Sequence, residues 1–287
     1  MKIEIPKTIF GREVKGATER ALKASQTQPP IDIPTPNLQP TNANDPVIMS
    51  YDHPEHGEFF QELIAKVNEV YSGTGAEIPV RTSGEVQGNL IKRAKLITTI
   101  YENQNLKDYG LFPITPLQSE QLLKDGKLPS PENYWEDLAF LLYDIKGSNK
   151  KEAEALRKSI KNNLSNLGLS QSDLEKRLVV VNAGLEIDSN MSHGVKPMIL
   201  QGLTKVYAHE VLDKTGENHK FEYGLDRGLP SVNQLGQGDR TLYMPSGNKF
   251  GLRVLYRFRV LVLSAWVDDL ADSSVNGRVT FARSASP

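Results

Sequence analysis

The sequence predicts an α+β protein with an N-terminal extended arm, a helical domain and then a mainly antiparallel β-sheet or β-sandwich domain. Prolines cluster near the N-terminus, apolar residues then recur at helical spacing, and short β-prone runs follow one another after Arg177. Strands without helices between them favour an antiparallel arrangement. We therefore expect an N-terminal helix with a Pro-rich arm, a helical domain and an antiparallel β domain, over residues 1–50, 51–177 and 178–287.

The N-terminal part has the composition of a tether. Residues 7–25 carry a narrow, alanine-rich apolar stripe, and a helix of this kind needs another surface to be stable. Six prolines fall in the segment from Pro29 to Pro46, which has hardly any charge, and in polyproline geometry this segment would reach on the order of 50 Å. We expect the arm to contact another polypeptide through apolar side chains, namely Phe10, Val14, Ile31, Ile33 and Leu38.

Helices are expected throughout the second part. The clearest start is at Thr115, Pro116 and Gln118, which supply an N-cap, a proline at the first helical position and a capping-box partner. Apolar spacing predicts further helices over residues 60–71, 90–101, 134–142 and 153–167, and Ser170 with Asp173 caps a short last one.

The third part is organised around residues 252–267, the longest apolar and β-prone run of the chain. One face of this run is apolar throughout, whereas the other begins with Arg253, Arg257 and Arg259 and turns apolar after them. Such a pattern indicates a strand that enters a site covered on both faces. We therefore expect this run to form a strand at the centre of the sheet.

The composition narrows the function classes. Lys plus Arg is 34 and Asp plus Glu is 35, so no global field draws the chain onto nucleic acid or anionic lipid. Cysteine is absent, which excludes disulfides, thiolate metal sites and cysteine nucleophiles. The longest uncharged apolar run, residues 260–267, is far shorter than the ~20 residues of a membrane helix. We expect a soluble protein without membrane insertion, in the cytoplasm or in a virion, and with no secretory signal.

Two histidines, His53 and His56, form the only weak candidate for a metal site. They lie three residues apart beside carboxylates, but Pro54 separates them and the segment lacks the helical H-E-x-x-H arrangement. Acidic residues before a helix also favour its positive end. We therefore expect the segment to cap a helix, and we assign no metal and no cofactor.

The remaining motifs do not form a catalytic set. His209 and Glu210 are adjacent in a β-prone run, where neighbouring side chains point to opposite faces. The glycines of residues 236–239 indicate a turn, because no helix follows them, and no G-x-S-x-G motif is present. We assign no catalytic residue, and the sequence favours a protein that is not an enzyme.

Two basic clusters could follow a phosphate backbone. Three cationic side chains lie in a predicted helix and three arginines on one strand face, namely Lys92, Arg93, Lys95, Arg253, Arg257 and Arg259. However, Tyr256 and Phe258 point to the opposite face of that strand, so it lacks the combined basic and aromatic surface of single-strand binders. Pairing with carboxylates of a neighbouring subunit explains the arginines equally well.

Three function classes follow, in order of preference. A structural or assembly subunit of a homo- or hetero-oligomer accounts for the arm, the dependent N-terminal helix and the balanced charge. By analogy alone, a virus or phage particle is one setting for such an arm. A nucleic-acid-binding protein that uses the two basic clusters is the alternative, and a metal-dependent enzyme that uses His53 and His56 is the third.

Overall fold

The computed structural model of the chain describes residues 8–9, 12–13, 45–74, 89–129, 134–246, 251–259, 261–265, 267, 269–271 and 277–283. The chain divides into two units, residues 1–42 and 43–287. Within the described residues, no helix is long and apolar enough to cross a membrane.

In the first unit, the structure describes one pair of short antiparallel strands, β1 (Thr8–Ile9) and β2 (Arg12–Glu13). The prediction of a helix over residues 7–25 is therefore wrong for the first residues of this range. Adjacent β-branched residues, Thr8 and Ile9, followed by a glycine favour a strand and a turn over a helix. The five expected partner-binding residues, Phe10, Val14, Ile31, Ile33 and Leu38, lie outside the described residues.

Two helices of the second unit begin at the caps that the sequence predicts. Thr115 and Gln118 form the predicted capping box at the start of α5, with Pro116 in the first turn, and Ser170 and Asp173 form another at η1. The bounds are α2 (Gly57–Tyr71), α3 (Leu90–Glu102), α4 (Gln104–Asp108), α5 (Pro116–Lys124), α6 (Lys150–Asn162), α7 (Leu164–Leu167), η1 (Gln171–Glu175), η2 (Glu210–Asp213) and η3 (Val232–Gln234).

The prediction of a helix over residues 134–142 is wrong, because this segment is the strand β5 (Trp135–Leu142). Its leucines, Leu138, Leu141 and Leu142, follow one another at spacings of three and one, which also fit a helix face. The residues from Leu138 to Leu142 are all buried, as in a central strand that is covered on both faces. Burial on two faces removes the alternation that would have identified a strand.

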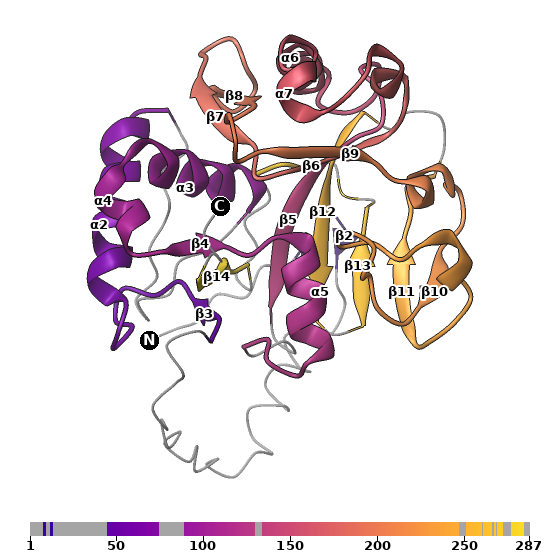
Figure 1. Cartoon of the computed structure of the whole chain (residues 1–287), viewed down its shortest axis with the longest axis horizontal. Helices are drawn as coiled ribbons and strands as arrows, with labels where there is room; N and C mark the ends of the chain where they lie inside the picture. Colours follow the sequence, from indigo (N-terminus) through magenta and orange to yellow (C-terminus); the bar gives the residue numbers. More distant parts are fainter. Residues whose placement is uncertain are drawn as a thin grey trace. The chain divides into compact units, whose positions relative to one another are not determined.

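One sheet of seven strands dominates the second unit (Figure 1). All neighbouring pairs are antiparallel except β11 and β13, which are parallel. In spatial order its strands are β10 (His219–Phe221), β11 (Arg240–Tyr243), β13 (Val262–Ser264), β12 (Leu252–Phe258), β5 (Trp135–Leu142), β6 (Leu178–Val181) and β9 (Lys205–Ala208).

The expected central strand is confirmed as β12, the fourth of the seven. The run of residues 252–267 is not one strand, however, because β12 and β13 pair as antiparallel neighbours. Arg259, between them, has a φ of 54°, a left-handed conformation typical of turns. Alternation along β12 is confirmed, since Leu252 and Val254 contribute to one core and Leu255 to another.

The chain is α+β as predicted, but its helical and β parts are not separate domains. β5 lies between β12 and β6 in one sheet, so strands from both sides of residue 177 interleave. A second, three-stranded sheet joins β3 (Val47–Ile48), β14 (Thr280–Arg283) and β4 (Leu111–Pro113), and β7 (Gly184–Ile187) pairs with β8 (Val195–Met198). The expected boundary at residue 177 is therefore wrong, because the sheets need strands from both segments.

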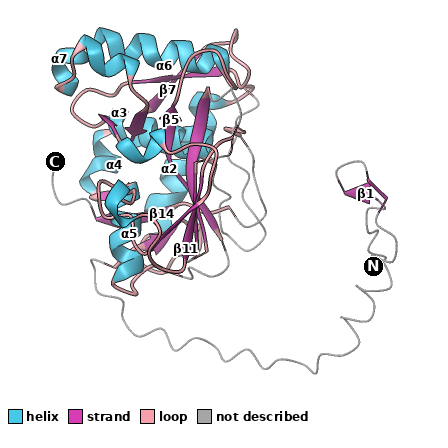
Figure 2. Cartoon of the chain, turned by 90° about the vertical axis from the view of Figure 1, so that its right-hand side faces the viewer, coloured by secondary structure: helices cyan, strands magenta, loops and turns pink. Residues whose placement is uncertain are grey.

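Two apolar cores cover the two faces of the seven-stranded sheet. On one face, α3 packs against β5 and α6 packs against β12, and the helices gather beside the strands (Figure 2). On the other face, side chains of the strands themselves pack with residues of the segment that follows β9, namely Val179, Leu141, Leu255, Leu263, Leu242, Val211 and Leu229. The central strands are therefore buried on both faces.

Candidate functional site at the free edge of strand β9

β9 is the last strand at one end of the seven-stranded sheet. Its partner is β6, with Lys205 opposite Val181 and Ala208 opposite Leu178. Among the described residues, no backbone group pairs with the other edge of β9. Unpaired N–H and C=O groups of such an edge are a template for another extended chain.

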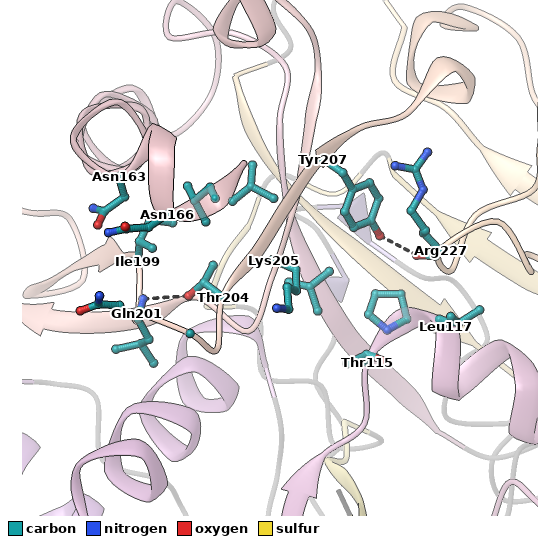
Figure 3. A pocket seen from close by; sticks show the side chains of 16 residues that line it. Thr115, Leu117, Asn163, Asn166, Ile199, Gln201, Thr204, Lys205, Tyr207 and Arg227 are labelled. Atoms are coloured by element: carbon teal, nitrogen blue, oxygen red, sulfur yellow. Dashed lines mark hydrogen bonds between the residues drawn. The ribbon is translucent and has the colours of Figure 1, made fainter. Parts of the chain in front are cut away.

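A pocket of about 420 Å³ lies along this edge (Figure 3). Its walls come from segments that are far apart in the sequence: residues 115–117 at the start of α5, residues 163–167 near α7, the turn of residues 199–204, β9 itself and Arg227. The lining includes five polar side chains, namely Thr115, Asn163, Asn166, Gln201 and Thr204.

The two sides of the pocket differ in chemistry. On one side, Leu167 and Ile199 pack against the core that contains Val206. On the other side, Lys205 and Arg227 place two exposed cations near the start of α5. The difference arises because successive side chains of a strand point to opposite faces, so the apolar Val206 and its cationic neighbour diverge.

Arg227 is fixed on the cationic side by contacts with β9 and with its own neighbour. Its carbonyl oxygen accepts a 2.5 Å hydrogen bond from the Tyr207 hydroxyl, its guanidinium group lies 4.6 Å from the centre of the Tyr207 ring, and its Nε is 3.1 Å from Asp226 Oδ1. Burial raises the pKa of Tyr207, so its hydroxyl stays a hydrogen-bond donor. These contacts pre-organise one cation of the pocket.

Lys205, in contrast, is exposed and takes part in none of the ion pairs found among the described residues. Its ammonium group is therefore available to an incoming carboxylate. An open strand edge, an apolar wall and a free cation together suit the binding of an extended peptide segment. The described lining contains no paired carboxylates and no histidine, so it supplies no general acid–base pair.

A second, polar pocket of about 800 Å³ lies beyond Arg227 and is lined in part by His209 and Asp226. His209 is buried, its Nδ1 accepts the N–H of Val211 at 3.3 Å, and its Nε2 lies 3.1 Å from the carbonyl oxygen of Asp226. Desolvation lowers the pKa of His209 against the opposing charge of Asp226. Both ring nitrogens are thus occupied, and the histidine ends β9 and caps η2 instead of offering a free base.

His53 and His56 lie just before α2, but the N-cap residue of this helix, His56, makes no side-chain capping hydrogen bond, so the expected side-chain cap is not found there. The Nδ1 atom of His53 accepts the N–H groups of Glu55 and His56 at 3.2 and 3.1 Å, and the two rings stack 4.9 Å apart. These bonds of His53 close the turn that precedes α2 and do not cap the helix itself, whose first turn holds the acidic Glu58. Burial lowers the pKa of both rings. Among the described residues, no group of three or more ligating side chains could hold a metal ion.

Five of the six residues of the basic clusters are buried, so the structure does not bring them to a common surface. Lys92, Arg93 and Lys95 are buried on α3, as are Arg253 and Arg257 on β12, and only Arg259 is exposed. Burial lowers the pKa of Lys92 to about 8 and that of Arg93 to about 10. Cations in the interior cannot follow a phosphate backbone, so these five residues do not support the nucleic-acid alternative.

The strand arginines hold α5 on the sheet through carboxylates of their own chain. Arg257 on β12 forms a fully buried ion pair with Glu136 on β5 at 2.9 Å, and its Nε donates to the Ser119 hydroxyl at 3.0 Å. The next residue of α5, Glu120, pairs with Arg240 on β11 through two hydrogen bonds, one of 2.7 Å. Arg257, one of the cations predicted for a partner, therefore serves internal packing.

The residues that define the β9 site were not among those singled out from the sequence. Lys205 and Tyr207 fall in a recognised β-prone run, but nothing local marks that strand as an edge. Arg227 lies in a glycine-containing loop whose contact with β9 depends on the tertiary fold. Comparison with models of protein families, with curated proteins and with solved structures gave no match for this chain.

Proposed function

We propose that the chain is a structural or assembly subunit whose N-terminal arm contacts a neighbouring polypeptide in a homo- or hetero-oligomer. The observation that supports this function best is the unpaired edge of β9 beside a pocket with an apolar wall and a free cation. Soluble proteins usually protect such edges, so an open one beside a pocket is a candidate attachment point for an extended chain.

The arm has the properties expected of the extended chain that would bind at this edge. Its composition, with six prolines from Pro29 to Pro46, favours an extended conformation that loses little entropy when it binds. At ~25 cal/mol per Å² of apolar surface, burying Phe10 and Val14 on a neighbour would contribute a few kcal/mol at most. A contact of that strength is weak alone and effective when many subunits repeat it. The setting expected by analogy, a virus or phage particle, belongs to the same proposal.

Deletion of residues 1–42 tests this function. The remaining residues form a unit with its own two cores, so we expect the deletion to leave a folded protein whose thermal midpoint changes by no more than a few degrees. Its native mass, measured by analytical ultracentrifugation, should fall towards that of a monomer at concentrations where the intact chain is assembled.

A matched control keeps the length and composition of the arm but scrambles the order of residues 29–42. It should assemble as poorly as the deletion variant if the order of side chains is recognised, and as well as the intact chain if the arm is only a spacer. Assembly of the deletion variant to the same extent as the intact chain would contradict the proposal, as would loss of its fold.

A further inference from the structure

We propose that the pocket along β9 of one copy binds residues Ile31–Ile33 of the arm of a second copy, which would add a short strand to the edge of the sheet. The inference rests on the proposed assembly function and names the two surfaces that would meet. It is carried by matches of length, of side-chain alternation and of charge between the arm sequence and the pocket.

The lengths of the two partners agree. Proline has no N–H to give to a strand ladder, so Pro30 and Pro34 limit backbone pairing to the three residues between them. β9 has four residues, which is sufficient for a partner of three. Two β-branched residues, Ile31 and Ile33, also favour an extended conformation in this stretch.

The alternation of side chains agrees as well. In an extended Ile-Asp-Ile segment, both isoleucines point to one face and Asp32 points to the other. The pocket offers the same division, with Leu167, Ile199 and Val206 on one side and the cations of Lys205 and Arg227 on the other. One orientation of the segment therefore places its apolar side chains on the apolar wall and its carboxylate near the free cation.

A neighbouring stretch of the arm provides a comparison within the same sequence. Asn37–Gln39 is also three residues long between two prolines, but it has one apolar side chain and no charge. It cannot offer two apolar side chains to one wall or a carboxylate to Lys205. The pocket should therefore discriminate between these two stretches, and the second one provides a matched control.

The connecting chain is long enough for binding between copies. Eleven residues separate Ile33 from Asp45, the first described residue of the body. At ~3.1 Å per residue in polyproline geometry they reach on the order of 40 Å, whereas a body of this size has a radius of gyration of roughly 18 Å. The segment can thus extend beyond its own body and meet the edge of another.

Charge exchange in the full chain is the first test. Lys205→Glu and Asp32→Lys, made singly, should each raise the dissociation constant of the assembly about fivefold or more, because an attraction becomes a repulsion. The double variant should recover most of the loss, since the same pair is restored with reversed signs. Asn37→Lys, the matched control, should leave the dissociation constant within about twofold of that of the intact chain.

Cross-linking is the second test. Because the natural sequence has no cysteine, the linker can react only with the cysteines that are introduced. Full chains with Ile33→Cys, mixed with full chains carrying Gln201→Cys on the exposed rim of the pocket, should form a heterodimer with a short bismaleimide linker. A mass label on one of the two variants identifies the mixed product. Leu38→Cys in place of Ile33→Cys should give much less of it.

The outcomes separate the two proposals. If the intact chain is monomeric at every concentration, both the assembly function and this inference are overturned. If assembly requires the arm but is indifferent to Lys205→Glu and gives no Ile33 cross-link, the function stands and the β9 site is wrong. If the single charge variants weaken assembly but the double variant does not recover it, Asp32 is not the partner of Lys205. A cross-link that forms only within one chain carrying both cysteines would exclude a second copy as the source of the segment.

Discussion

The two outer strands of the seven-stranded sheet, β10 and β9, are treated differently by the fold. Beside β10, the carbonyl oxygen of Lys220 accepts the N–H of Gly236 at 2.8 Å, and the Lys220 ammonium group reaches the carbonyl oxygen of Asp239 at 3.2 Å. Beside β9, the described residues supply no such covering segment. One edge is closed by a loop of the same chain, and the other is left open next to a pocket.

This difference indicates where to look for function in a protein whose sequence lacks a catalytic motif. An uncovered edge carries a risk of aggregation, and a fold that covers one edge shows that the chain can supply a cover. Leaving β9 open is therefore a feature in need of an explanation, and a partner strand provides one. Substitutions at either edge, or in the helix α5 that contacts both regions, test this difference between β9 and β10.

The largest effect is expected at α5, because this helix contacts both regions. Pro116 and Leu117 line the pocket at β9, whereas Glu120 accepts the N–H of Gly224 at 2.7 Å and pairs with Arg240 beside β10. Glu120→Ala should lower the free energy of unfolding by about 3–5 kcal/mol, because it leaves a buried cation without its partner. Urea denaturation measures this loss.

The control is the double variant Glu120→Met with Arg240→Leu. It replaces both charges with apolar groups and should recover most of the stability. A loss below ~1 kcal/mol for Glu120→Ala would show that water or another group readily replaces the carboxylate, and that the ion pair does not hold the helix.

The next effect concerns the loop that covers β10. Gly238 has a φ of +82°, and a Cβ atom added to it would lie 2.6 Å from the carbonyl oxygen of Phe221. Gly238→Ala should therefore cost about 1–3 kcal/mol of stability through strain and a clash with backbone. It should also promote self-association, because the loop no longer closes the edge.

Gly236→Ala is the matched control for this variant. Its φ is +87°, but a Cβ atom there meets nothing within 4 Å, so it should cost about 1 kcal/mol from backbone strain alone. Thermal unfolding and light scattering would compare the two variants. Equal effects from both would mean that close approach of the loop to β10 is unimportant.

The smallest effect is a pH dependence at the end of β9. The pKa of His209 is lowered from 6.5 by desolvation, with Asp226 and Glu210 opposing and Arg227 reinforcing the shift. The folded state thus favours the neutral ring, so its contribution is present above pH 6.5 and is lost as the pH falls through the lower pKa of the folded state. His209→Asn keeps an acceptor for the Val211 N–H and should reduce the loss of stability in this range.

The pKa values of His53 and His56 are shifted in the same direction, so the asparagine variant should remove only part of the acid sensitivity. Denaturant midpoints between pH 5 and pH 7.5 give the comparison. A His209→Asn protein with an unchanged pH profile would show that this ring does not contribute to the acid sensitivity of the fold.

The sequence was informative wherever the determining interactions are local. The capping box of Thr115 and Gln118 was predicted because its partners lie three residues apart, and the alternation along β12 because neighbouring residues contribute to different cores. β5 was misassigned because burial on two faces gives a continuous apolar run, which a helix also produces. The predicted boundary at residue 177 was wrong for a different reason, because a change in local sequence pattern does not reveal which strands pair.

The candidate site could not be predicted from the sequence because it depends on distant contacts. Its walls combine the start of α5, the segment around α7 and the loop of Arg227, and none of these has a local pattern that indicates a pocket. The basic clusters were visible, but the burial of a member such as Arg257 was not, because the carboxylate that pairs with it lies 121 residues away. Charge in a sequence indicates a surface only when no such partner exists.

The pairing of β5 with β12 also has a consequence for how the chain is made. Glu136 and its partner Arg257 are 121 residues apart, so at about 5–20 residues per second a ribosome needs roughly 6–24 s between them. During that interval β5 has left the ribosome with one of its two neighbours still unsynthesised. Its apolar residues, Leu138 to Leu142, therefore lack that neighbour in the nascent chain, and apolar surface exposed in this way is prone to aggregation.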